Sequence, residues 1–217
     1  MDISKITPSM PYILEGLGIT LKIVSLAIIL GLVLGVVLAL CKISRYKVLA
    51  YIADFYTSIF RGTPLILQLM IIYFGAPQLF DYKIEGDVAA ILAFGLNSSA
   101  YVSEIFRAGI QAVDKGQKEA AMALGIPYRK MMWNIILPQA LKNILPALMN
   151  EFITLTKESA VVTAIGVTDI MRRAYIVGAD TFNYMEALLF AGFIYYVLVM
   201  LLTLVGKLLE RRLRSND

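Results

Sequence analysis

Several polar side chains stand inside segments that are otherwise apolar and long enough to cross a bilayer. A charged residue at membrane depth costs at least ~2.5 to 3.5 kcal/mol on insertion scales, so it usually faces a bundle interior or a watery cavity. Glu151, Thr154 and Glu158 follow the spacing i, i+3, i+7 and would share one helix face. Such a face offers acceptors for an ammonium group, and Arg61 or Lys157 would bind a carboxylate. Binding an amino acid requires both kinds of group, because the substrate carries an ammonium group and a carboxylate.

A second group of polar residues has a comparable helical spacing. Asn97, Tyr101 and Glu104 would lie along one face of an earlier helix. The candidate substrate-binding residues are Gln68, Asn97, Ser98, Tyr101, Glu104, Glu151, Thr154 and Glu158. The alternative is structural: Glu104 and Arg107 would pair with each other, and the amide and hydroxyl groups would join neighbouring helices. The excess of acid over base within the spans favours a cationic amino acid, and Arg61 acts against that preference.

The elements that must position these residues are transmembrane helices. Hydrophobic residues make up 59% of the 217 residues, above the roughly half that is usual in soluble domains. We therefore predict an all-α integral membrane protein, a single domain over residues 1–217. Five transmembrane helices are expected at about 19–41, 54–80, 88–113, 141–165 and 184–204.

Glycine and proline add local detail to the spans. Gly31 and Gly35, four residues apart, would let another helix approach the first span closely. Arg61, Gly62 and Pro64 interrupt the second span, which predicts a broken helix beside a cavity or buried in protein.

Basic residues set the expected orientation. They follow the first span, fill the segment after the third and end the last span, so these regions are predicted to be cytoplasmic. The N-terminus would lie outside and the C-terminus inside. Arg172 and Arg173, in the external connection expected from about 166 to 183, run against this tendency.

A polar segment at about 114–140 separates the third and fourth spans. Ala120 to Leu124 are strong helix formers, Glu119 is expected in the first turn of a short helix, and Gly125 stands where that helix would be capped. Pro127 suits the first position of a second helix, which would start near Tyr128. A helical hairpin at the membrane surface is predicted.

The residues of this hairpin resemble a known signature. Glu119-Ala120-Ala121, then Gly125, then Ile136-Leu137-Pro138 match the EAA motif of ABC importer membrane subunits in order and spacing, although the last part reads Ile-Ile-Leu-Pro. The stretch Phe60-Arg61-Gly62-Thr63-Pro64 and the later Ser99-Ala100-Tyr101 resemble the permeases for polar amino acids in the same superfamily.

This resemblance implies a transport complex with several subunits. It implies a type I ABC importer-like fold in a bacterial cytoplasmic membrane, a permease dimer (a homodimer in preference to a heterodimer), an ATPase pair that holds ATP and Mg²⁺, and an extracytoplasmic amino acid-binding protein. The predicted ATPase-coupling residues are Glu119, Ala120, Ala121, Met122, Ala123, Gly125 and Ile126.

Several classes are excluded by what the sequence lacks. It has no histidine and a single cysteine, Cys41, so no metal site is expected. It has no phosphate-binding loop, so the chain is not expected to be an enzyme or to hold a cofactor. The basic residues sit at the ends of apolar runs and predict no nucleic-acid binding. An ion-coupled secondary transporter or a channel without an ATPase, and a structural scaffold, stay open as alternatives.

Overall fold

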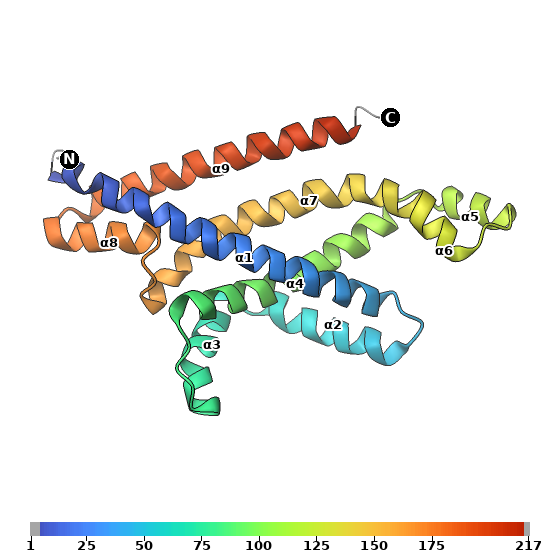
Figure 1. The fold of residues 1–217 in the computed structure, drawn as a ribbon, viewed down its shortest axis with the longest axis horizontal. Coiled ribbons are helices and arrows are strands. Elements are labelled where there is room, and N and C mark those ends of the chain that lie inside the picture. Colours follow the sequence, from blue (N-terminus) through green and yellow to red (C-terminus); the bar gives the residue numbers. More distant parts are fainter. Residues whose placement is uncertain (1–4, 215–217) are drawn as a thin grey trace.

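The structure is a computed structural model that describes residues 5–214, so the ends of the predicted domain, 1–4 and 215–217, lie outside the described residues. Within residues 5–214 every regular element is a helix (Figure 1). The α-helices are α1 (Met10–Lys42), α2 (Lys47–Gly62), α3 (Leu65–Phe80), α4 (Gly86–Gln111), α5 (Lys115–Ala123), α6 (Tyr128–Met131), α7 (Leu137–Glu158), α8 (Ile170–Thr181) and α9 (Tyr184–Arg214). Two 3₁₀ segments, η2 (Thr7–Ser9) and η4 (Ser159–Ile165), and a π-helical segment, η3 (Met132–Ile136), complete the order.

Helices α1 and α4 form the centre of the molecule and pack through small residues (Figure 1). A Cβ atom on Gly31 would lie 2.9 Å from Cβ of Ser98, and one on Gly35 would lie 2.6 Å from Cβ of Val102. These separations are shorter than van der Waals contact, so only glycine fits at both positions. The close approach predicted for the Gly31 and Gly35 face is confirmed.

The second predicted span is two helices. Thr63 ends α2 in an extended conformation, because the residue before a proline is sterically kept out of the helical region. Pro64 then precedes α3, and the two helix axes are bent by 102°. The predicted break is confirmed, and α3 leaves the body of the molecule at a steep angle (Figure 1).

The hairpin between α4 and α7 has a defined cap at each end of α5. The side chain of Asp114 accepts a hydrogen bond of 2.7 Å from the backbone N–H of Gly116. At the other end Gly125 has a φ of +68°, and the N–H groups of Gly125 and Ile126 donate to Met122 and Ala121. This is a Schellman motif, so the C-terminal cap predicted at Gly125 is confirmed.

One detail of the predicted hairpin is wrong. The helix begins at Lys115, so Glu119 lies beyond the first turn, which contains no acidic residue. Asp114, one position before the helix, supplies the negative charge there instead. Ala121, Met131 and Ile136 are buried against one another, which gives the hairpin a small core of its own.

Helix α8 lies inside the connection expected between the last two spans. Asp169 caps it, accepting a hydrogen bond of 2.8 Å from the backbone N–H of Arg172. Arg173, which runs against the positive-inside tendency, is engaged with α1: it is 2.7 Å from Glu15, and its guanidinium lies 4.4 Å from the Tyr12 ring centre. Its charge is therefore paired within the protein and carries little weight in setting orientation.

Length and composition identify the elements able to cross a membrane. In residues 5–214 three helical stretches qualify, those over α1, α4 and α9, and the bent pair α2 and α3 makes a fourth crossing if it is one span. Helix α7, which contains most of the predicted fourth span, is long enough but too polar to qualify on its own. Its polar residues are accordingly where a functional site is sought.

Candidate functional site

Helix α7 carries polar residues along one face for most of its length. Asn143, Ala147, Glu151, Thr154 and Glu158 follow one another at intervals of three or four residues, which keeps them on one side of the helix. Asn143, Thr154 and Glu158 are exposed and Glu151 is half-buried. At 1.5 Å per residue this face is about 22 Å long. We call these five residues the polar face of α7.

Glu151 joins this face to α4. The hydroxyl of Ser98, which is fully buried, donates a hydrogen bond of 2.8 Å to Oε1 of Glu151. Two residues predicted for one site from separate stretches of sequence therefore touch. A carboxylate at the α4–α7 contact has one oxygen held by Ser98 and offers the other as an acceptor.

Gln68 and Asn97 lie together but hold the break between α2 and α3. The Gln68 amide donates to the carbonyl of Phe60 at 2.9 Å and to the hydroxyl of Thr63 at 2.8 Å. Asn97 donates to Oε1 of Gln68 at 3.0 Å and also to the Phe60 carbonyl at 3.0 Å. The last carbonyl groups of a helix have no donor within that helix, and here two buried side-chain amides provide the missing N–H donors. These bonds account for both residues without a ligand.

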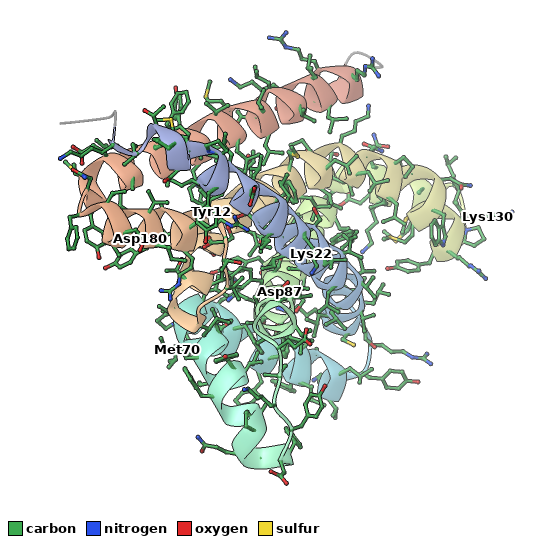
Figure 2. All side chains as sticks on the ribbon, turned by 60° about the vertical axis from the view of Figure 1, so that its left-hand side comes forward. Tyr12, Lys22, Met70, Asp87, Lys130 and Asp180 are labelled. Carbon is green, nitrogen blue, oxygen red and sulfur yellow. The ribbon has the colours of Figure 1, made fainter. Side chains whose placement is uncertain are left out.

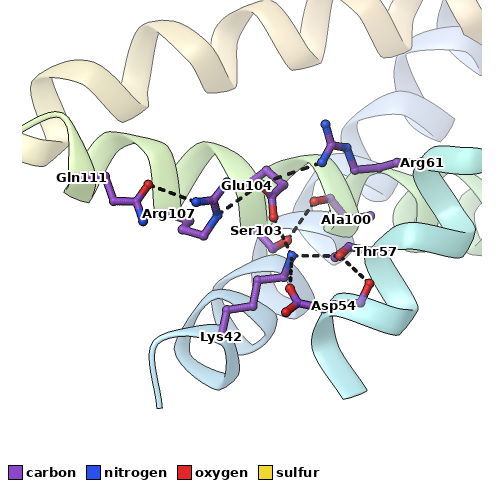
Figure 3. Close-up of polar contacts among 9 residues, drawn as sticks. All are labelled: Lys42, Asp54, Thr57, Arg61, Ala100, Ser103, Glu104, Arg107 and Gln111. Atoms are coloured by element: carbon purple, nitrogen blue, oxygen red, sulfur yellow. Dashed lines mark hydrogen bonds and ion pairs between the residues drawn. The ribbon is translucent and has the colours of Figure 1, made fainter. Parts of the chain in front are cut away.

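Glu104 is the centre of a charged cluster formed by α1, α2 and α4 (Figure 3). Oε2 accepts a hydrogen bond of 2.6 Å from Nη2 of Arg107, Oε1 accepts one from Nζ of Lys42, and Nη1 of Arg61 lies 3.8 Å from Oε2. Nζ of Lys42 also lies 3.2 Å from Asp54, although only 4% of the Lys42 side chain is exposed. The pairing of Glu104 with Arg107, which the sequence offered as the structural alternative, is confirmed.

The cluster borders an open depression of about 620 Å³ between α4, α7 and the end of α2. Its polar lining residues are Arg61, Tyr101, Glu104 and Asn143, and small residues such as Gly109 and Ala147 leave the space. Ala147 and Asn143 belong to the polar face of α7, so the depression opens directly onto that face. Tyr101 and Glu104 thus share a depression with Asn143 and Ala147, at one end of the polar face, and Ser98 contacts that face further along, at Glu151.

The predicted coupling residues divide into two kinds. Glu119, Ala120, Met122 and Ala123 are exposed on α5, whereas Ala121 is buried in the core of the hairpin. Gly125 and Ile126 form the turn that ends the helix. The hairpin lies at the opposite end of the molecule from α8, as Lys130 and Asp180 mark in Figure 2. The exposed residues form a short apolar and acidic surface at that end.

Some residues of this arrangement were missed by sequence reasoning. The basic residues that follow the first span, Lys42 among them, are predicted to lie in a cytoplasmic loop, but Lys42 is the last residue of α1 and its side chain is buried in the cluster. Asn143 lies two helical turns before Glu151, so continuing the same spacing backwards would have found it. Tyr56 donates to the carbonyl of Leu96 at 2.9 Å and joins α2 to α4, which no local pattern indicates.

A family model covers most of the chain. Residues 31–215 match the model described as the binding-protein-dependent transport system inner membrane component. The chain belongs to this family. The sequence-based recognition of a membrane subunit of an importer is therefore confirmed, and an inner-membrane, multi-pass location follows from family membership. The family is that of the membrane component, which is distinct from the ATPase of such systems.

Relatives align along nearly their whole length. The arginine transport system permease protein of Bacillus subtilis (strain 168) is 64% identical over 217 residues, covering 100% of this chain and 99% of the relative. A putative glutamine transport system permease protein of Rickettsia bellii (strain RML369-C) is 53% identical, covering 96% of each chain. The glutamate/aspartate import permease protein of Escherichia coli O6:H1 is 37% identical, covering 97% of each.

Solved structures share the fold. The crystal structure of an amino acid ABC transporter with histidines matches with a TM-score of 0.94 at 44% identity, covering 98% of this chain and 99% of the other. An inward-facing methionine ABC transporter matches with a TM-score of 0.78 at 21% identity, covering 95% and 98%, which bears on the fold alone. The predicted fold class, an all-α permease like those of type I ABC importers, is confirmed.

Proposed function

We propose that this family member is the permease subunit of an ATP-driven importer for polar, preferentially basic, amino acids. The observation that carries the proposal is the polar face of α7, joined to α4 by Ser98 and Glu151 and opening onto the depression beside Arg61 and Glu104. A route about 22 Å long with carboxylates, amides and a guanidinium suits a substrate that carries an ammonium group and a carboxylate.

We assign the substrate path to Ser98, Tyr101, Glu104, Glu151, Thr154 and Glu158 of the predicted residues, together with Asn143. Gln68 and Asn97 support the broken helix beside it. The acidic residues Glu151 and Glu158 favour a cationic substrate, and the similarity to a permease named for arginine supports the same preference. Relatives named for glutamine and glutamate are in keeping with the broader class of polar amino acids.

In this proposal a separate ATPase supplies the free energy for transport by hydrolysing ATP. The exposed side of α5, with Glu119, Ala120, Met122 and Ala123, would dock on an ATPase, and Gly125 and Ile126 would hold its end. The permease would work as a dimer, preferentially of identical chains, and a solute-binding protein would deliver the amino acid from outside. ATP and Mg²⁺ would be held by the ATPase pair. The chain would cross the membrane five times, with α7 as the fourth crossing.

The test is uptake by proteoliposomes that contain this chain with and without the ATPase of its transport system. Radiolabelled L-arginine and L-glutamine are supplied with the binding protein, and ATP is enclosed or omitted. We expect uptake only when both ATP and the ATPase are present. Ion-driven uptake by this chain alone would favour the secondary transporter and contradict the proposal.

The path itself is tested by Glu151→Gln and Glu158→Gln in the same proteoliposomes, with ATP turnover as the measured quantity. Each change keeps the shape of the side chain and removes a carboxylate from the polar face of α7. We expect both to lower amino acid-stimulated ATP turnover, with Glu210→Gln on α9, outside this face, as the matched control. Unchanged ATP turnover in both variants would contradict this assignment and show that the substrate path lies on another face of the molecule.

A further inference from the structure

Arg61 is the least engaged of the three cations around Glu104. Lys42 and Arg107 both donate hydrogen bonds to the Glu104 carboxylate, whereas Nη1 of Arg61 lies 3.8 Å from it, beyond hydrogen-bond distance. The Arg61 guanidinium donates no hydrogen bond to any group within residues 5–214, and 46% of its side chain is exposed. Its donors are therefore available to a ligand.

The charges of the cluster do not balance. Lys42, Arg61 and Arg107 face two carboxylates, Asp54 and Glu104, which leaves one positive charge in excess. Because Lys42 and Arg107 are the close partners of those carboxylates, the excess charge is centred on Arg61. A buried or half-buried charge is stabilised by a counter-charge, so a single negative charge would complete the cluster.

The Arg61 side chain lines the depression between α4 and α7. The guanidinium carbon lies 5.5 Å from the centre of the Tyr101 ring, which supports it from one side. Arg61, Tyr101 and Asn143 all line the depression of about 620 Å³. A planar guanidinium presents paired N–H donors that match the two oxygens of a carboxylate, which a lysine ammonium does not.

We infer that Arg61 binds the α-carboxylate of the transported amino acid in this depression. The inference rests on the proposed function and adds to it the orientation of the substrate. Both oxygens of the Glu104 carboxylate already accept hydrogen bonds from cations, so the ammonium group and side chain extend towards Asn143 and Glu151 on the polar face of α7. A free carboxylate is then a requirement of the permease itself, in addition to any selection made by the binding protein.

The experiment measures direct binding to the purified complex of this chain with its ATPase, without the binding protein. The probes are L-arginine and L-glutamine and their carboxamides, in which the carboxylate is replaced by a neutral amide. The wild type is expected to bind the acids about tenfold to a hundredfold more tightly than the amides, the range of one charge-assisted hydrogen bond. In Arg61→Gln this ratio should fall to about 1, because the donor pair is lost. Arg61→Lys should give an intermediate ratio.

Arg107→Lys is the matched control for Arg61→Lys, since both changes keep the net charge of the cluster. Arg107 bonds to Glu104 and to Gln111 at 3.0 Å and does not line the depression, so the acid-to-amide ratio should persist in this variant. Two results would overturn the inference alone: an equal loss of acid and amide binding in Arg61→Gln, or an equal fall of the ratio in Arg61→Lys and Arg107→Lys. A wild-type complex that binds none of the four probes would overturn the proposed function, and this inference with it.

Discussion

At the scale of single residues, polar side chains in an apolar helix serve two different needs here. Gln68 and Asn97 donate hydrogen bonds to the carbonyl of Phe60, which the break between α2 and α3 leaves without a partner inside the helix. Glu104, Glu151 and Arg61 instead present charge at a depression or at the polar face of α7. Residue type alone does not separate structural from functional polar residues. The difference is whether the side chain already forms hydrogen bonds to backbone groups nearby.

Gln68→Leu tests the structural role. The substitution leaves the Phe60 carbonyl with one donor fewer and the buried Asn97 amide without one of its two acceptors, so one of its N–H groups is unsatisfied. We expect the free energy of unfolding to fall by about 1 to 3 kcal/mol, the cost of leaving a buried polar group unsatisfied. SDS-induced unfolding of the purified protein measures it. Gln78→Leu, at an exposed position of the same helix, is the control, and equal losses would contradict the assignment.

The Lys42 and Glu104 pair is tested by a double-mutant cycle with Lys42→Met and Glu104→Gln. The Lys42 side chain is only 4% exposed, so its interaction with Glu104 is poorly screened by water. We expect a coupling energy of about 0.5 to 3 kcal/mol in SDS-induced unfolding. The pair of Lys22 and Asp87, 3.0 Å apart and 57% and 35% exposed, should give a lower coupling, below about 1 kcal/mol. A larger value for the exposed pair would refute the comparison.

At the scale of helices, local chemistry decides some features completely. Pro64 forces Thr63 out of the helical region, and Gly125 takes the left-handed conformation that ends α5. Gly31 and Gly35 allow α4 to approach α1. Each of these was predicted, because the cause lies in one or two neighbouring residues.

Other features depend on packing and were not predicted. Helix α8 is short and amphipathic, and it lies in a connection that hydropathy alone marks as loop. The cluster around Glu104 joins residues from α1, α2 and α4, so it exists only at the angles at which those helices cross. The burial of Lys42 follows from the same packing. A charge at the end of an apolar run is otherwise expected in the headgroup region.

Gly125→Val tests the turn that ends α5. Nothing lies within 4 Å of a Cβ placed on Gly125, so the cost comes from its φ of +68° and not from a clash. A β-branched residue loses about 1 to 2 kcal/mol in this conformation, which should unwind the end of α5 and weaken binding of the ATPase. Co-purification of the ATPase and amino acid-stimulated ATP turnover are measured. Gly125→Asn tolerates the conformation and should retain both, and normal turnover with valine would argue against the role of the turn.

Gly35→Ala tests the contact of α1 with α4. The added Cβ would lie 2.6 Å from both Cβ and Cγ1 of Val102, so one helix must move. Overpacking of this kind costs about 1 to 3 kcal/mol, which should appear as a lower midpoint in SDS-induced unfolding. Gly18→Ala, on the same helix, meets nothing within 4 Å and should be neutral or slightly stabilising. Equal midpoints for the two variants would show that α1 and α4 are free to separate.

At the scale of the whole molecule, the hairpin of α5 and α6 and the helix α8 lie at opposite ends (Figure 1). The proposed transport cycle needs these ends on opposite sides of the membrane, with the hairpin facing the ATPase. The basic residues Arg129 and Lys130 favour the cytoplasm for the hairpin end. Arg173 at the other end is paired with Glu15 and does not oppose this orientation.

The orientation is tested with single cysteines placed at Lys130 and at Asp180, which are exposed at the two ends (Figure 2). Cys41→Ser removes the native cysteine and serves as the background. A membrane-impermeant maleimide added to intact cells should label Asp180→Cys, whereas Lys130→Cys should react only after the membrane is permeabilised. The opposite pattern would place the hairpin outside, where no ATPase could reach it, and would remove the route by which energy is proposed to enter the permease.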